Sequence, residues 1–285
     1  MTRQEAPDRR GARLHPPPPQ DFDPFTATEE DLERHGLPLR PDPQTQPGMA
    51  ALWERRASRY RSFDHLEPRP DNVTAAKEAV IAGALGPAPI ESCGYSLVSH
   101  SPFTVLSVTW TVPNLRFSPS PNGPNHFHTY VGLGLLDVHV EMTVDATQNV
   151  TSKLWAQAVG PIDLPVGPGD VISGALCLDT KPPGTAHYFL ANETRSQTMN
   201  FRVDTGFPPA VTIDVGVTRG DGNQPIDPLA HFGVVYFDEV IAFTTRDSRS
   251  LTSGDAITMV DEHGSTLAKP VRLNDHAFKA VYAAA

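Results

Sequence analysis

Residues 103–114 read FTVLSVTWTVPN and carry the clearest strand signal in the chain. β-Branched and aromatic residues fill the run from Phe103 to Val112, and Pro113 ends it because proline cannot donate to a sheet ladder. Similar runs, separated by Pro, Gly, Asn and Asp, continue to the end of the chain, which is typical of an antiparallel all-β domain. The expected strands are Phe103–Val112, Phe127–Leu133, Val138–Val144, Lys153–Val159, Val171–Leu178, Thr185–Ala191, Thr198–Val203, Val211–Val217, Gly233–Phe243, Ile257–Val260 and Ala277–Tyr282.

The first part of the 285-residue chain has a different composition. The whole chain has 29 prolines, and many of them, including Pro16 to Pro19, precede residue 48. This segment therefore cannot form continuous helix or sheet. Capping residues and turn signals predict short helices over residues 26–36, 49–60 and 74–85. We therefore expect a Pro-rich, partly helical arm at residues 1–89 and a β-sandwich or barrel at residues 90–285.

The composition also excludes several classes of protein. The formal net charge is −10 and the basic residues do not cluster, which disfavours a nucleic-acid partner. No apolar stretch reaches the roughly 18 residues of a membrane span, and residues 1–19 lack the apolar region of a secretion signal. We expect no membrane partner and no signal peptide, and a location that is cytoplasmic or left unassigned. Two cysteines, Cys93 and Cys177, form either one bridge or two free thiols.

Common nucleophile and phosphate-binding motifs are absent from the sequence. A metal site is one alternative, because His126 and His128, and likewise His139 and Glu141, are spaced two apart and share a strand face. If the two strands were neighbours, these four side chains could converge on one ion. This spacing matches no zinc signature, and we predict neither a metal nor another cofactor.

Several short motifs follow one another in a fixed order between residues 91 and 245. They are Cys93-Gly-Tyr95, Trp110-Thr-Val-Pro-Asn114, Tyr130-Val-Gly-Leu-Gly134, Val166-Gly-Pro-Gly-Asp170, Tyr188-Phe-Leu-Ala-Asn-Glu-Thr194 and Pro228-Leu-Ala-His-Phe-Gly233. In this order they resemble the glutamic peptidases, or eqolisins. The resemblance implies a concanavalin-like jelly roll of two bent antiparallel sheets, with a peptide-binding groove on the concave surface of one.

The resemblance also implies site residues. The family's catalytic glutamine falls on or next to Glu141, and its catalytic glutamate falls on Asp214, so both positions are changed. Gln157 stands where the family has the acid of a Trp-Xaa-Glu-Trp strand. We predict Glu141 and Asp214 as the catalytic pair. The predicted substrate-binding residues are Tyr130, Gln157, Trp110 and Trp155, with packing in the core the preferred role of the two tryptophans.

These substitutions leave the activity open. Two neighbouring carboxyls resist double ionisation, so Asp214 as base and a protonated Glu141 as donor could hydrolyse peptides at acid pH. Asp is shorter than Glu by one methylene, and a misplacement of about 1 Å can cost roughly 10²-fold in rate. We therefore expect a possible acid endopeptidase, impaired or inactive. The alternatives are a non-catalytic module that binds peptide or glycan and a metal-binding sandwich; the oligomeric state is left open.

Overall fold

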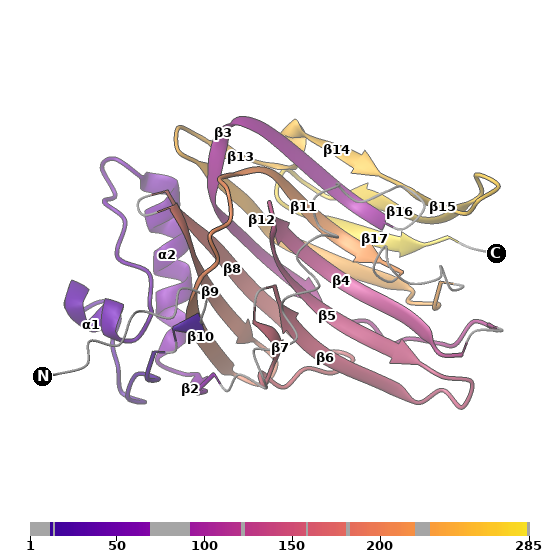
Figure 1. Cartoon of the computed structure of the whole chain (residues 1–285), viewed down its shortest axis with the longest axis horizontal. Helices are drawn as coiled ribbons and strands as arrows, with labels where there is room; N and C mark the ends of the chain where they lie inside the picture. The colour runs from indigo at the N-terminus through magenta and orange to yellow at the C-terminus, as the bar shows by residue number, and fades with distance from the viewer. Residues whose placement is uncertain are drawn as a thin grey trace, which may run out of the picture.

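A computed structural model describes residues 12–13, 15–68, 92–120, 123–157, 159–180, 183–219 and 229–283. Most of the described chain is strand (Figure 1). The N-terminal elements are β1 (Ala12–Arg13), α1 (Glu29–Arg34), α2 (Pro47–Tyr60) and β2 (Asp64–His65). The larger strands that follow are β3 (Ser92–Thr111), β4 (Asn125–Leu133), β5 (Leu136–Val144), β6 (Val150–Ala156), β8 (Val171–Thr180), β9 (Pro183–Asn192), β10 (Gln197–Asp204), β11 (Ala210–Thr218), β12 (Val234–Thr244), β16 (Thr266–Arg272) and β17 (Phe278–Tyr282). The short elements are β7 (Gly160–Ile162), β13 (Ser248–Arg249), η3 (Leu251–Ser253), β14 (Gly254–Ile257) and β15 (Met259–Val260).

The 20-residue strand β3 belongs to both sheets of the fold. Its first part pairs with β11 and β14, and its second part pairs with β8 and β12. The side chains that enter the core are at odd positions up to Leu97 and at even positions from Leu106 onward. This parity changes near Pro102, which has no N–H to give to a ladder and is therefore suited to an interruption of a strand.

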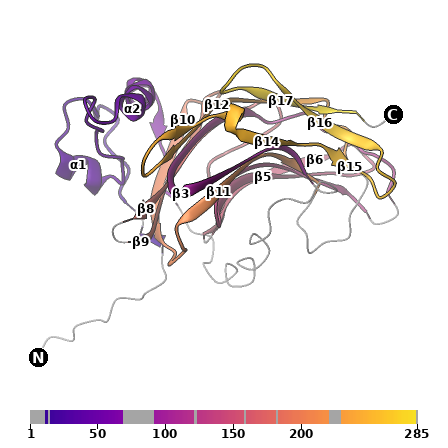
Figure 2. The ribbon, with the colours of Figure 1, turned by 90° about the horizontal axis from the view of Figure 1, so that it is seen from above.

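The two sheets meet along β3. One sheet runs in the order β7–β6–β5–β4–β11–β3–β14, and the other runs β10–β9–β8–β3–β12–β17–β16–β15. These pairings are antiparallel, and both sheets are visibly curved (Figure 2). One large apolar core lies between them and takes side chains from nearly every long strand. Among the described residues, no helix is long and apolar enough to cross a membrane.

The arm packs on the outer face of the second sheet. Thr28 caps α1, where its hydroxyl and the Asp31 carboxylate form a capping box, and Pro47 stands at the first position of α2. Trp53 and Leu32 belong to a second, smaller apolar cluster within the arm. Helix α2 lies against β8, β9 and β10 (Figures 1 and 2).

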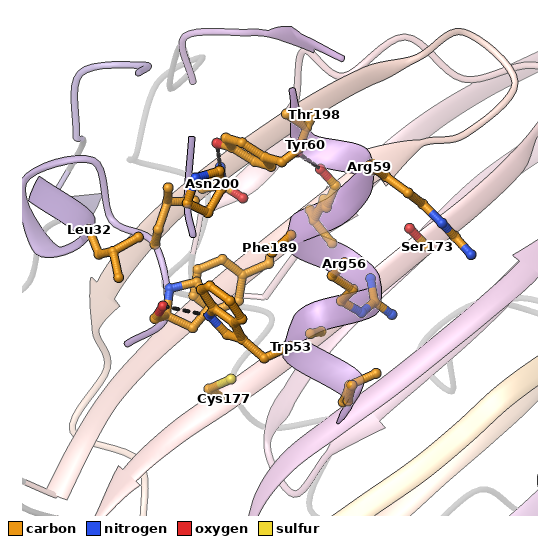
Figure 3. A pocket seen from close by; sticks show the side chains of 18 of the residues that line it. Leu32, Trp53, Arg56, Arg59, Tyr60, Ser173, Cys177, Phe189, Thr198 and Asn200 are labelled. Carbon is orange, nitrogen blue, oxygen red and sulfur yellow. Dashed lines mark hydrogen bonds between the residues drawn. The ribbon is translucent and has the colours of Figure 1, made fainter. Parts of the chain in front are cut away.

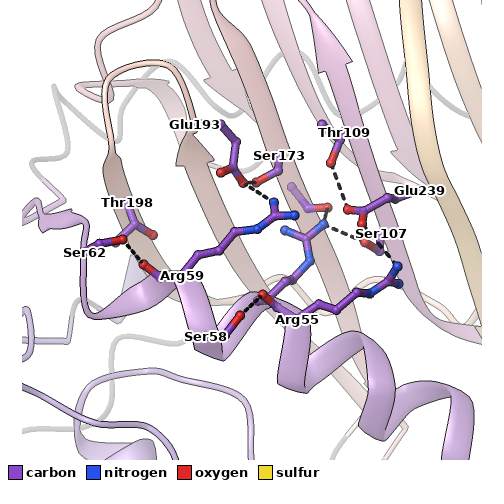
Figure 4. A network of polar contacts seen from close by, with 12 residues as sticks. Arg55, Ser58, Arg59, Ser62, Ser107, Thr109, Ser173, Glu193, Thr198 and Glu239 are labelled. Carbon is purple, nitrogen blue, oxygen red and sulfur yellow. Dashed lines mark hydrogen bonds and ion pairs between the residues drawn. The ribbon is translucent and has the colours of Figure 1, made fainter.

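Ion pairs join α2 to the sheet beneath it (Figure 4). Arg55 pairs with Glu239 at 3.3 Å, and Arg59 pairs with Glu193 at 3.2 Å. The hydroxyls of Thr109 and Ser173 donate to the same two glutamates. The charged face of the helix is thus matched by carboxylates that the sheet already holds in position.

The sequence predictions of an all-β sandwich and of two arm helices are confirmed, whereas the jelly-roll arrangement stays a prediction. Strand β16 was not expected, because Lys269 and Pro270 interrupt its apolar pattern. β16 forms an antiparallel hairpin with β17, and β17 in turn pairs with β12. The helix expected at residues 74–85 lies outside the described residues. Both cysteines are free thiols.

Candidate functional site

A polar surface covers the outer side of the first sheet. Along β4 and β5 the buried residues alternate with partly exposed ones, and the buried set faces the core. The outward positions carry imidazoles, carboxylates and hydroxyls where the inward positions carry Val, Leu, Phe and Met. We call this surface, formed by the outward side chains of β3, β11, β4, β5 and β6, the polar face.

The strand register arranges the polar face in rows that run across neighbouring strands. Residues directly opposite each other in antiparallel strands point to the same side of the sheet. The first row is Ser96, Asp214, Gly132 and Asp137; the second is Gly94, Gly216, Tyr130, His139 and Trp155; the third is Ser92, Thr218, His128, Glu141 and Lys153.

Asp214 is the most buried acid of the polar face, with 6% of its surface exposed. Burial raises the pKa of Asp214 above its ordinary value, and a hydrogen bond from Ser96 opposes part of that rise. Its Oδ1 atom is buried and has no hydrogen-bond partner among the described residues. Asp214 therefore holds its proton more readily than an exposed aspartate and has an acceptor atom still to be satisfied.

The Tyr130 side chain lies between two acids of the polar face, Asp214 on β11 and Asp137 on β5. Its hydroxyl lies over Gly132, so closely that any side chain at Gly132 would collide with it. Burial and the two flanking carboxylates, Asp137 and Asp214, raise the pKa of Tyr130. A neutral hydroxyl is therefore held between two carboxyl groups.

A small cavity of about 10 Å³ opens beside these groups. Its lining includes Tyr130, Asp214 and the glycine pair Gly94 and Gly216. A Cβ at Gly94 would strike the backbone of Val215, so only glycine allows the two strands to approach this closely. The cavity is of the size that holds about one water molecule.

Imidazole rings form a stack beside the tyrosine. His128 lies 5.1 Å from His139, and His139 lies 6.2 Å from Trp155, with the ring planes nearly parallel in both pairs. Burial, together with the neighbouring imidazoles His139 and His126, lowers the pKa of His128 to about 3. The Nδ1 atom of His139 is 2.9 Å from Asp137 Oδ1. This stack joins a carboxylate, two imidazoles and an indole along one edge of the site.

The side chains of the alternative metal site do share a face, because β4 and β5 are neighbours and His128 lies opposite Glu141. Within the described part of the chain, however, no group of three or more His, Cys, Asp or Glu is placed to hold a metal ion. His128 and His139 stack face to face, so their nitrogen atoms do not point at a common centre. The geometry gives no support to the metal alternative.

The structure does not bring the predicted catalytic pair together. Glu141 lies opposite His128 and Lys153, whereas Asp214 lies opposite Gly132, four residues farther along β4. The two residues are two strands and four residues apart, so with ~4.8 Å between strands and ~3.4 Å per residue their Cα atoms are roughly 17 Å apart. Glu141 is therefore not the neighbour of Asp214 that the sequence predicted. The acid of β5 that shares a row with Asp214 is Asp137.

The predicted substrate-binding residues divide into two groups. Tyr130 and Trp155 lie on the polar face, and Gln157 follows β6 with its backbone N–H donating to the Asp137 carbonyl at 3.0 Å. The predicted substrate-binding role of Trp110 is wrong, because this side chain is 1% exposed and packs in the core between the sheets. A substrate on the polar face cannot touch it there, whereas core packing was its preferred role from the sequence.

Asp137 and Ser96, the neighbours of Asp214 in the first row, are polar-face residues that the sequence analysis did not select. A signal for Asp137 was present, because the two-residue loop Gly134–Leu135 fixes which residues of β4 and β5 face each other. Gly134 has a φ of 60°, a value that suits glycine in such a loop. From that loop, Gly132 must lie opposite Asp137. No comparable local signal identifies Ser96, whose neighbour Asp214 is remote in sequence.

These features define a class: an antiparallel β-sandwich with acid–base side chains in rows on the outer face of one sheet. Residues 91–281, more than half of the chain, match the Peptidase A4 family. The chain therefore belongs to this family, the glutamic peptidases or eqolisins, as the resemblance of its motifs indicated. No curated protein sequence gives a significant match.

Two solved structures have a similar fold. Scytalido-glutamic peptidase with a transition-state analog inhibitor superposes with a TM-score of 0.54 at 13% identity, covering 68% of this chain and 98% of that chain. SCP-B, described as a member of the eqolisin family in a complex with the tripeptide Ala-Ile-His, gives the same TM-score of 0.54 and 13% identity, covering 68% of this chain and 98% of that chain. At this identity the likeness concerns the fold alone.

Proposed function

We propose that this glutamic-peptidase-like protein binds peptides along its polar face and that its peptidase activity is impaired. The observation that carries the proposal is the strand register, which places Glu141 and Asp214 in different rows. A proton shared between two carboxyls requires that they lie within hydrogen-bond reach, directly or through one water molecule. This register supports a loss of the paired acid–base site on a fold that relatives use to bind peptides.

The polar face has chemistry suited to a peptide backbone and its side chains. Tyr130 offers a hydroxyl, His139 an imidazole held by Asp137, and Trp155 an aromatic ring for stacking. The similar structure of SCP-B holds the tripeptide Ala-Ile-His, which makes this tripeptide a suitable first probe.

One observation favours a second candidate, slow acid hydrolysis through a different set of residues. Asp214 has a raised pKa, a one-water cavity lies beside it, and the Tyr130 hydroxyl is close to both. In its ionised form Asp214 would take a proton from the attacking water and then give it to the leaving amine, and the Tyr130 O–H would donate to the oxyanion that forms at the scissile carbonyl. This arrangement replaces the amide donor of the family with a phenol.

Binding and cleavage are measured separately to test both candidates. Calorimetric titration with Ala-Ile-His should show binding that Trp155→Ala weakens and that Phe25→Ala, an exposed change on the arm, leaves unchanged. Under the first candidate, casein cleavage between about pH 2 and 7 should be weak or absent. If casein is cleaved, and both Asp214→Asn and Tyr130→Phe abolish that cleavage, the second candidate replaces the first. A folded protein that neither binds the tripeptide nor cleaves casein would overturn both.

A further inference from the structure

A second cavity lies far from the polar face, between the arm and the outer side of the other sheet. Its volume is about 150 Å³. Figure 3 shows Leu32, Trp53, Phe189 and Cys177 grouped in one part of the lining, and Arg56, Arg59 and Ser173 grouped in another. The lining thus has an apolar part and a polar part, and both are shared by elements remote in sequence.

Most polar groups in this lining already have partners. The Trp53 indole N–H donates to the Pro38 carbonyl at 3.0 Å, and Asn200 donates to the Tyr60 hydroxyl at 2.6 Å. Arg59 pairs with Glu193. Burial raises the pKa of the Cys177 thiol to about 12, so this sulfur is a neutral, unreactive part of the wall.

Arg56 differs from every other group of the lining. Its Nη2 atom donates to the Ser107 hydroxyl at 2.6 Å and to the Gly174 carbonyl at 3.2 Å, which are both uncharged acceptors. Its Nε atom is buried and has no hydrogen-bond partner among the described residues. A buried guanidinium without a carboxylate partner is costly, because desolvation is repaid only by an opposite charge in good geometry.

The charges around Arg56 leave one positive charge in excess. Helix α2 directs three arginines at the sheet: Arg55 and Arg59 pair with Glu239 and Glu193 (Figure 4), and Arg56 donates to Ser107 and Gly174. Each glutamate is already engaged by an outer arginine and by a hydroxyl. The missing partner is therefore a single negative charge, and the apolar part of the lining requires that it be attached to an apolar body.

We propose that this cavity is a binding site for a small apolar monocarboxylate, with the carboxylate at Arg56 and the apolar body against Trp53 and Phe189. Because Nη2 already donates to Ser107 and Gly174, the carboxylate would accept a charge-assisted hydrogen bond from the Nε–H that has no partner among the described residues. A cavity of about 150 Å³ lined by apolar side chains takes a body of roughly the size of a benzene ring. An aryl-alkanoic acid has this combination. The site is independent of peptide binding, because it lies on the other sheet.

The proposal is tested first with the unmodified full-length chain and two ligands of nearly equal shape. Calorimetric titration with 3-phenylpropionate should show saturable binding with one site per chain. The uncharged 3-phenylpropan-1-ol should bind about 10- to 100-fold more weakly, because a hydrogen bond to a charged group is worth more than one to a neutral group. Equal affinities for acid and alcohol, or no binding of the acid, would overturn the proposal without any mutation.

Matched variants then locate the site. Arg56→Met keeps an apolar stem and should remove the preference for the acid, whereas Arg55→Met on the same helix, outside the cavity lining, should retain it. Ala175→Leu places extra volume in the cavity and should weaken both ligands together. Circular dichroism confirms that each variant is folded. Retention of the acid preference by folded Arg56→Met would contradict the assignment.

Discussion

The polar face and the face beneath the arm lie on the outer sides of different sheets, and their polar groups are placed in different ways. On the polar face the strand register alone sets which side chains meet, as with Asp214, Gly132 and Asp137. Under the arm, a helix from a remote part of the sequence brings its arginines to glutamates of the sheet. The first arrangement depends on backbone pairing, whereas the second depends on docking of side chains, so the two faces should respond differently to mutation.

The largest loss of stability is expected from a substitution in the apolar cluster of the arm. Trp53 is 9% exposed and packs with Leu32, Leu37 and Ala57 in the arm's own apolar cluster. Trp53→Ala should reduce the local stability of the arm by about 3–5 kcal/mol, the usual cost of removing a large buried aromatic side chain. Because this cluster is separate from the main core, the sandwich should stay folded.

Hydrogen exchange read by mass spectrometry checks this expectation. Helix α2 should lose protection in Trp53→Ala while the strands of the polar face keep theirs. Phe25→Ala is the control, because Phe25 is 44% exposed although its ring also contacts Trp53. Equal loss of protection in the arm and in β4 would show that the two faces are not independent.

A smaller effect is expected from the backbone of the polar face. A Cβ at Gly94 would meet the Val215 carbonyl, which cannot move without shifting the β3–β11 ladder. A Cβ at Gly132 would meet only the hydroxyl end of Tyr130, which can rotate away. We expect Gly94→Ala to cost about 1–3 kcal/mol of unfolding free energy, and Gly132→Ala to cost less.

Urea unfolding of the two glycine variants makes the comparison. Gly132→Ala should also change the environment of Tyr130, which ultraviolet difference spectra of the tyrosines report. If Gly132→Ala proved the more damaging of the two, the tyrosine rather than the strand pairing would control this part of the polar face.

The same contrast explains what could be predicted from the sequence. The strand runs around Trp110 and the alternation along β4 and β5 depend on neighbours in sequence, so β4 and β5 were found with small errors at their starts. The strand around Trp110 was found only in its second half, because β3 begins at Ser92 rather than at Phe103. The prediction that His139 and Glu141 share a strand face was also correct, because a strand alternates with a period of two. The predicted closeness of Glu141 to Asp214 was not, because the row of each residue depends on the loop at Gly134 and on the pairing of β4 with the distant β11.

Docking of the arm has no local signal at all. The sequence shows a helix with several arginines, and nothing near it identifies Glu193 or Glu239 as partners. Arg56 is the clearest example, since the position of its side chain between α2 and the sheet follows only from the contacts with Ser107 and Gly174. Motif resemblance found the family and the polar face, but a cavity formed by the arm lies outside the motifs that carry the resemblance.

The smallest change in stability is expected when an acid is neutralised, and its sign should differ between the two faces. Burial raises the pKa of Asp214, so the folded protein binds this proton more tightly than the unfolded chain does. The resulting cost is full at pH values above the folded pKa and disappears below the unfolded pKa of about 3.9. Asp214→Asn has no charge to bury, so it should raise the melting temperature at pH 7, and its advantage should vanish at about pH 3.5.

Glu193→Gln is the matched change under the arm and should act in the opposite direction. Glu193 is paired with Arg59 and accepts a hydrogen bond from Ser173, so its neutralisation should lower stability at pH 7 by about 0.2–1 kcal/mol. Melting curves of both variants at several pH values decide the matter. If both substitutions lowered the melting temperature at pH 7, Asp214 would have an ionic partner like that of Glu193, and the contrast between an unpaired acid on one face and paired acids on the other would be lost.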